Sequence, residues 1–233
     1  MSQTVSISFF RFTGPWARFW ALAMMGQARK PIANIPDIGF WKLCGAGKGE
    51  GFAPNITPKV FAILATWPDA QTARKQADEA PIFKRYRDKA TESWTVFLTP
   101  TAARGAWSGQ TPFEPQPDAA GPLAALTRAT IRPNILKRFW GRVPDISAMI
   151  GQDPNVTFKI GIGEVPMLQQ VTFSIWPSKS AMDAFARTGP HAQAIRAVRD
   201  EGWFKEELYA RFVVHSDSGT WGGASPLAQL ETA

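Results

Sequence analysis

The chain has 233 residues and a formal net charge of +7 at pH 7; 45% of its residues are apolar, 19% are charged, and it holds 10 Trp and 16 Phe. This composition is typical of a globular chain with a sizeable core and excludes intrinsic disorder. The single cysteine, Cys44, excludes an intramolecular disulfide framework and is typical of a reducing compartment. The charge favours a membrane surface or an acidic protein as partner; Lys and Arg are too scattered for a nucleic-acid arm.

The sequence predicts a cytoplasmic protein without a membrane-spanning helix. The longest apolar stretch, Phe19 to Met25, is far shorter than the roughly 20 residues that a spanning helix needs. The N-terminus also lacks the basic-then-apolar order of a signal peptide.

The first half of the chain is predicted to follow the order βαββαβ. Trp67-Pro68 ends the third β run, because proline disfavours ladder pairing, and Asp69 stands at the N-cap of the next helix, which Pro81 divides. Apolar and β-branched runs predict strands over 5–12, 40–44, 60–66 and 93–99, and helices over 15–28 and 69–89.

The second half shows the same order. Trp176-Pro177 ends a β run, Ser178 stands at an N-cap, and Gly189-Pro190 divides the helix that follows. The predicted strands are 124–131, 156–162, 170–175 and 207–215, and the predicted helices are 134–150 and 178–203.

Sequence landmarks indicate that the two halves are copies of one unit. Trp67, Pro81 and Arg87 recur as Trp176, Pro190 and Arg196 at a constant offset of 109 residues, and Gly105-Ala-Trp107 recurs as Gly219-Thr-Trp221. The order βαββαβ is the ferredoxin-like pattern, so the expected fold is α+β: two tandem ferredoxin-like repeats that pack face to face or close into an α+β barrel. We expect a first repeat over 1–113 that serves as scaffold, a Pro-rich linker over 114–121 and a second repeat over 122–233.

His191 is the main candidate for a cofactor ligand. It follows Gly189-Pro190 at a predicted helix start and shares one helix face with Ile195, which we include as a candidate contact. A helix N-terminus disfavours imidazolium, so the ring keeps a lone pair for a metal. The corresponding residue of the first copy, at 191 − 109 = 82, is Ile82, so the fold itself does not require histidine there.

A structural role for His191 in the core stays open as the alternative. No second histidine, cysteine or carboxylate cluster lies nearby at ligand spacing, so a protein-only zinc or non-haem iron site is poorly supported. One histidine suffices where the cofactor brings its own equatorial ligands, as haem does. His215 is interpreted as a polar strand end.

Four basic residues within predicted strands are candidate contacts for an anionic group such as haem propionates. Lys42 and Lys159 both stand at mid-strand, which indicates a shared structural or rim role, and Arg128 and Arg211 must each find an anion or face water. The Gly-rich run after Cys44 fits neither a P-loop nor a Rossmann fingerprint and is interpreted as a turn.

Several runs resemble the spheroidene monooxygenase family of purple photosynthetic bacteria over nearly the whole chain. The Gly-Pro-His segment also resembles that of dimeric α+β barrel haem proteins, in which a helical histidine is the proximal iron ligand. The runs that carry the family resemblance are 39–45, 126–133, 143–147, 159–166, 189–196 and 201–204.

This resemblance implies a haem-dependent oxygenase of carotenoid biosynthesis. It implies oxidation at C-2 of acyclic carotenoids, from spheroidene to spheroidenone, by two successive hydroxylations and loss of water. Haem b, with iron on His191, O₂ and electrons from a ferredoxin are the implied cofactors and co-substrates. The lipid-soluble substrate implies peripheral contact with the inner or photosynthetic membrane; the oligomeric state is left open.

Two other functions are retained. The first is a cofactor-independent α+β barrel monooxygenase, and the second is a haem- or lipid-binding module without turnover. A Soret band on haem addition separates the first from the haem enzyme, and oxidation of an acyclic carotenoid separates the second.

Overall fold

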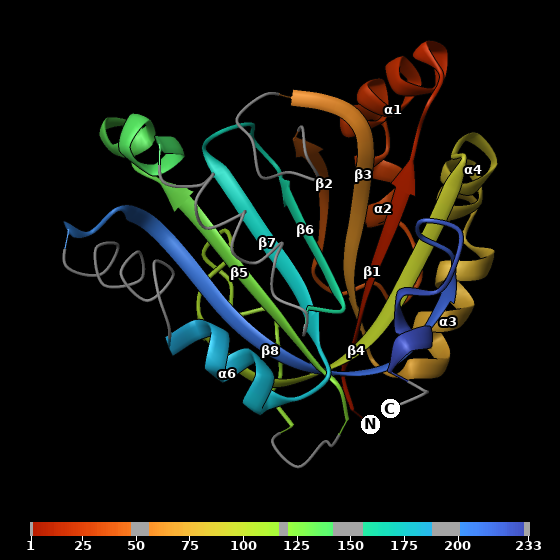
Figure 1. Ribbon diagram of the computed structural model, residues 1–233. Coiled ribbons are helices and arrows are strands. Elements are labelled where there is room, and N and C mark those ends of the chain that lie inside the picture. Colours follow the sequence, from red (N-terminus) through yellow and green to blue (C-terminus); the bar gives the residue numbers. More distant parts are fainter. Residues whose placement is uncertain (1, 48–55, 117–120, 142–155, 188–200, 231–233) are drawn as a thin grey trace.

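The computed structural model describes residues 2–47, 56–116, 121–141, 156–187 and 201–230 (Figure 1). Its first half contains β1 (Thr4–Arg11), α1 (Pro15–Gln27), α2 (Arg29–Ala33), β2 (Trp41–Gly47), β3 (Ile56–Trp67), α3 (Ala70–Glu79), α4 (Pro81–Lys89) and β4 (Glu92–Gly105). Its second half contains β5 (Leu123–Ile131), the 3₁₀ turn η1 (Pro133–Ile135), β6 (Phe158–Gly163), β7 (Gln169–Trp176), α6 (Lys179–Arg187), β8 (Phe204–Gly219) and the 3₁₀ turn η2 (Pro226–Gln229).

The helix boundaries predicted around the two Trp-Pro pairs are confirmed. The Asp69 carboxylate accepts a hydrogen bond from the Thr72 N–H at 2.8 Å and so caps α3. The Ser178 hydroxyl accepts one from the Ala181 N–H at 3.2 Å at the start of α6. Pro81 begins α4 and separates it from α3, as expected, whereas the expected break at 189–190 lies outside the described residues.

The eight strands form one closed antiparallel barrel, which confirms the predicted α+β barrel. Its strand order is β1-β3-β2-β6-β7-β5-β8-β4. The strands of the two halves join edge to edge, through β2 with β6 and through the long pairing of β4 with β8, rather than packing as two separate sheets face to face. Closure removes the unpaired strand edges that two open sheets would leave.

Strand alternation sends large apolar side chains into the barrel. Phe9, Trp94, Phe158 and Phe173 meet there, with the Trp94 and Phe158 ring centroids 4.6 Å apart. Helices α1 to α4 cover the outer face of the first half, and α6 lies against the second half (Figure 1). The barrel interior is therefore packed, and the outer faces carry the difference between the halves.

Two similar turns close on tryptophans at the barrel ends. Trp107 pairs with Gln110 and Trp221 with Ala224 in isolated β-bridges, and both rings pack against the barrel core. Trp107 is fully buried, and its indole N–H donates to Glu164 at 2.7 Å. The segments 105–107 and 219–221, which are alike in sequence, thus have the same local structure.

Candidate functional site

The outer face of the second half has a floor of small and polar side chains. Strand register aligns its residues in rows across β6, β7, β5 and β8. One row is Lys159, Ser174, Ala125 and Arg211, and the next is Gly161, Thr172, Thr127 and Tyr209. Because residues opposite one another in register project to the same face, each row forms a strip of one surface.

The first half carries large apolar residues at the same register positions. Counted from the strand-ending Trp67 and Trp176, Leu43 and Ile63 correspond to Gly161 and Thr172. In the same way Trp41 corresponds to Lys159, Phe97 to Arg211, Phe10 to Ala129 and Phe61 to Gln170. In the first half these side chains pack under α1 to α4 in one apolar cluster. The second half lacks this filling and has a flat floor instead.

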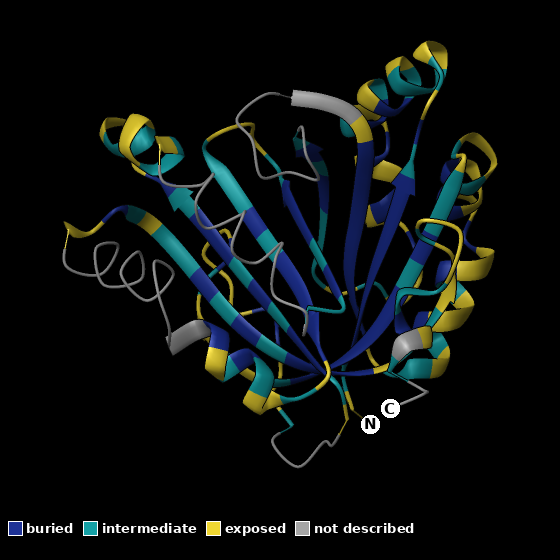
Figure 2. Ribbon diagram, in the orientation of Figure 1, coloured by how far each residue is buried: buried dark blue, intermediate teal, exposed yellow. Residues whose placement is uncertain are grey.

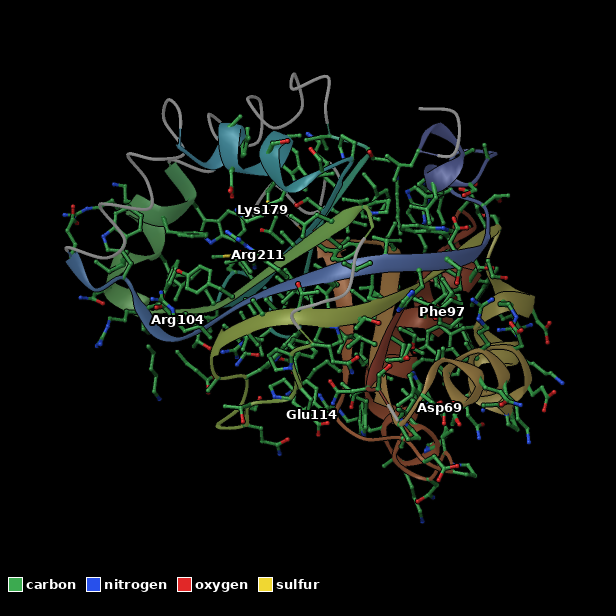
Figure 3. The ribbon with its side chains drawn as sticks, turned by 90° about the horizontal axis from the view of Figure 1, so that it is seen from below. Asp69, Phe97, Arg104, Glu114, Lys179 and Arg211 are labelled. Carbon is green, nitrogen blue, oxygen red and sulfur yellow. The ribbon has the colours of Figure 1, made fainter. Side chains whose placement is uncertain are left out.

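Lys159 and Arg211 stand at the two ends of one row. Between them lie only Ser174 and Ala125, and at about 4.8 Å per strand the row spans roughly 14 Å. Arg211 lies on the α6 side of the barrel and Phe97 on the α3 side (Figure 3), and an Arg211 nitrogen is 3.6 Å from an Asp183 oxygen. The floor therefore combines small residues with cations at its edges, which suits a flat anionic ligand.

Helix α6 closes one end of this floor with an apolar cluster. Met182 and Phe185 of α6 pack against Leu123 and Trp176, and the Trp176 and Phe185 rings lie 5.3 Å apart. The Trp176 indole N–H donates to the Ser174 hydroxyl at 2.9 Å, as Trp67 does to Ser6 at 2.8 Å. These contacts fix α6, whose last residue precedes His191 by four positions.

Arg128 lies inside the barrel, on the face opposite this floor, in a cluster of charged groups. Its guanidinium forms an ion pair with Glu206 and lies 4.0 Å from Glu164, whose other oxygen is 3.0 Å from Lys42 Nζ. The Trp107 ring lies 5.8 Å from both cations. Arg128 is 1% exposed, and its Nε has no hydrogen-bond partner among the described residues. The chain itself provides the anions that this arginine requires.

The carboxylates of this cluster are held ionised while the neighbouring thiol is held neutral. Desolvation raises the pKa of Glu206, but hydrogen bonds from the N–H groups of Gly109 and Ser108 and the charge of Arg128 outweigh it, so the pKa lies below 4.5. Burial, and then the charge of Glu164, raise the pKa of the Cys44 thiol. Cys44 is therefore a neutral core side chain in this setting.

The expected shared role of Lys42 and Lys159 is wrong. Lys42 projects into the barrel towards Glu164, whereas Lys159 stands between the inward-facing Phe158 and Ile160 and so projects outward. A shift of one residue along a strand exchanges its faces, and the register aligns Lys159 with Trp41.

The other predicted site residues fall into two groups. His191 and Ile195 lie outside the described residues, so their assignment stays a prediction. His215 is exposed at the end of the paired part of β8 and contacts the Thr99 hydroxyl, in agreement with a polar strand position. Within the described ranges, no group of three or more His, Cys, Asp or Glu side chains is arranged to hold a metal, and no helix is long and apolar enough to span a membrane.

Sequence reasoning missed Glu164, Glu206 and Trp107 as partners of Arg128. They lie 36, 78 and 21 residues from it (164 − 128, 206 − 128 and 128 − 107) and meet only when the barrel closes. One signal was available: Glu206 precedes a strand residue by a position that, counted from Trp221, matches Glu92, which accepts the Gly223 N–H at 2.8 Å.

Comparison with solved structures shows the fold. Two aldoxime dehydratases, one of them in complex with butyraldoxime, superpose with TM-scores of 0.62 at 10% and 11% identity; the comparisons cover 98% and 92% of this chain and 86% and 82% of theirs. The chain is thus an α+β barrel protein.

Comparison with curated sequences shows the family, although no family model matches the chain. It is 50% identical to spheroidene monooxygenase of Cereibacter sphaeroides over 99% of its own length and 72% of that protein's. It is 48% identical to the Rhodobacter capsulatus enzyme of that name (96% and 95% covered) and 36% identical to that of Rubrivivax gelatinosus (90% and 81%). The chain belongs to the spheroidene monooxygenase family, a family of oxidoreductases.

Proposed function

We propose that this protein is a haem-dependent carotenoid monooxygenase that converts C-2 of acyclic carotenoids such as spheroidene into a ketone. The name shared by its relatives supports the substrate class and the use of O₂. The observation that carries the cofactor proposal is the flat floor of the second half, where Gly161 and Thr172 replace the Leu43 and Ile63 of the first.

The proposed reaction consists of two hydroxylations at one carbon. Each consumes one O₂, two electrons and two protons, inserts one oxygen into a C–H bond and releases one water. The resulting geminal diol loses a third water to give the ketone. Electrons are proposed to come from a reduced ferredoxin, an acidic class of protein that a chain with net charge +7 would attract.

The described residues fit a haem b. A planar macrocycle needs a surface without large side chains, and its propionates need cations at the edge; the rows of Gly161, Thr172 and Ser174 with Lys159 and Arg211 meet both needs. His191 is proposed as the axial iron ligand and Ile195 as its apolar neighbour. Bound there, haem would supply O₂ activation.

The protein's own side chains would bind and orient. Lys159 and Arg211 would hold the anionic edge, with Asp183 setting the position of the Arg211 guanidinium, and α6 would exclude water at the Trp176 end. Arg128, on the barrel's inner face, would instead keep the strands β5, β6 and β8 in register through Glu164 and Glu206.

We further propose that the chain arose by duplication, with residues 1–113 as scaffold, 114–121 as linker and 122–233 as the cofactor-binding copy. The like order of elements and the like Trp turns support this division. The apolar filling of the first half's outer face supports its role as scaffold.

The test is turnover of spheroidene by the purified, haem-loaded protein with O₂ and a ferredoxin–reductase couple. We expect mass spectrometry to detect the hydroxylated and keto products, and His191→Ala to remove both the Soret band and turnover while the far-UV circular dichroism is unchanged. An unaltered Soret band in His191→Ala would refute the ligand assignment.

The same experiment separates the alternatives. Turnover by haem-free protein would establish a cofactor-independent monooxygenase. A haem complex that leaves spheroidene unoxidised would establish a binding module.

A further inference from the structure

Helix α1 is apolar on two faces, of which the fold uses one. Ala21 and Met24 are buried against the sheet, and the Trp20 ring packs 5.2 Å from that of Tyr86. On the opposite side Trp16 is 83% exposed, Phe19 69% and Leu22 52%. These three residues, spaced by one helical turn each, are named here the α1 patch.

The α1 patch accounts for most of the exposed large apolar surface of the described residues. The other such side chains are Val165 and Met167, in the turn between β6 and β7. In Figure 1 this turn and α1 both lie at the upper edge of the molecule, and Figure 2 shows α1 largely exposed or half-buried. A contiguous apolar patch of this kind marks an interaction surface.

The charge around the α1 patch is positive. Residues 1–36 contain no Asp or Glu, and Arg18, Arg29 and Lys30 lie on α1 and α2, the last two fully exposed to solvent by class. Trp and Phe next to basic side chains are typical of helices that lie in the interface of an anionic bilayer, where the rings enter the headgroup region and the cations pair with phosphates.

We propose that the α1 patch docks the protein on an anionic lipid bilayer. The surface deepens the proposed function, on which it rests for the lipid-soluble substrate, and it gives that substrate a route that does not cross bulk water. Its test uses vesicles alone and needs neither haem nor turnover, so the two proposals can fail separately.

The test is co-sedimentation of the full chain with vesicles of equal parts phosphatidylglycerol and phosphatidylcholine. We expect binding that weakens on pure phosphatidylcholine, and a partition coefficient at least about tenfold lower for Trp16→Gln/Phe19→Gln. Arg29→Gln/Lys30→Gln should weaken binding to the anionic vesicles, whereas the matched pair Lys75→Gln/Lys84→Gln, exposed on α3 and α4, should not. Trp16→Phe should retain binding but lose the part of the fluorescence that brominated lipids quench.

Three results would overturn the proposal. One is absence of vesicle binding by the wild type. Another is equal binding by wild type and Trp16→Gln/Phe19→Gln, with unchanged melting temperatures showing both to be folded. The third is a dimer that this double variant dissociates without a change in vesicle binding, which would make the α1 patch an interface between two copies of the chain.

Discussion

Arg128 is the buried cation on which one end of the barrel depends. It is 1% exposed and pairs with Glu206 while Glu164 lies 4.0 Å away, so its loss leaves two carboxylates in a low-dielectric setting. We expect Arg128→Met to lower the free energy of unfolding by about 3–5 kcal/mol. Urea denaturation followed by circular dichroism measures this change.

Arg211 provides the matched control. It is 43% exposed and lies 3.6 Å from Asp183, so Arg211→Gln should cost less than about 1 kcal/mol. Equal losses for the two variants would contradict the assigned burial of the Arg128 cluster.

Glu206 makes the stability depend on pH at the acidic side. Its pKa is lower in the folded protein than the ordinary value of 4.5, because desolvation is outweighed by the amide hydrogen bonds and by Arg128. Such a group contributes stability that is complete above its unfolded pKa and is lost as the pH falls through its folded pKa. We expect the free energy of unfolding to decline below pH 4.5. Glu206→Gln should reduce the slope of that decline; an unchanged slope would count against the shift.

The charged cluster shows where residue-level prediction from sequence ends. Arg128 was recognised as an arginine that needs an anion, which the strand pattern suffices to show. Its partners come from the turn after β6 and from the start of β8, and no local pattern brings these together. The mistaken equivalence of Lys42 and Lys159 has a different cause, a one-residue slip in aligning two strands of period two.

At the scale of elements, two glycines allow the turns that end β4 and β8. Gly105 has φ +98° and Gly219 φ +87°, and a Cβ on them would lie 2.1 Å from the Glu207 carbonyl oxygen and 2.3 Å from that of Ser93. Both the dihedral angle and the close strand approach require glycine. The recurrence of Gly105-Ala-Trp107 and Gly219-Thr-Trp221 in the sequence therefore has a structural cause.

We expect Gly105→Ala to destabilise the protein by at least about 2 kcal/mol, because the neighbouring backbone must shift. Gly26→Ala in α1 is the control: no atom lies within 4 Å of the added Cβ. That substitution should be neutral or stabilising by about 0.5–1 kcal/mol. Thermal melts of both variants measure the difference, and comparable melting temperatures would refute the role of Gly105.

Elements with local signals were predictable, and their assembly was partly so. Asp69, Ser178 and Pro81 mark helix boundaries through their own side chains, so the sequence sufficed to locate them. The strand runs were also recognised, though β4 and β8 extend well beyond the predicted ends because they pair with each other across the seam between halves. Choosing the closed barrel over packed sheets needed that long-range pairing.

At the scale of the whole molecule, the two halves share a framework and differ on their outer faces. In the first half Leu43, Ile63 and Phe97 fill the space beneath the helices. In the second half Gly161, Thr172 and Arg211 take these positions. Sequence alignment alone did not reveal this contrast, because it depends on which face each strand residue occupies. The contrast is the physical basis for proposing the cofactor site in residues 122–233.

Haem titration of a variant that restores the first half's residues tests this account most directly. Wild type should develop a Soret band that saturates with haem, and Thr172→Val, which keeps the side-chain size, should do the same. Gly161→Leu/Thr172→Ile should remain folded by circular dichroism but lose the band, because the larger side chains occupy the floor. A Soret band of wild-type intensity and affinity in the folded double variant would contradict a haem site on the outer face of the second half.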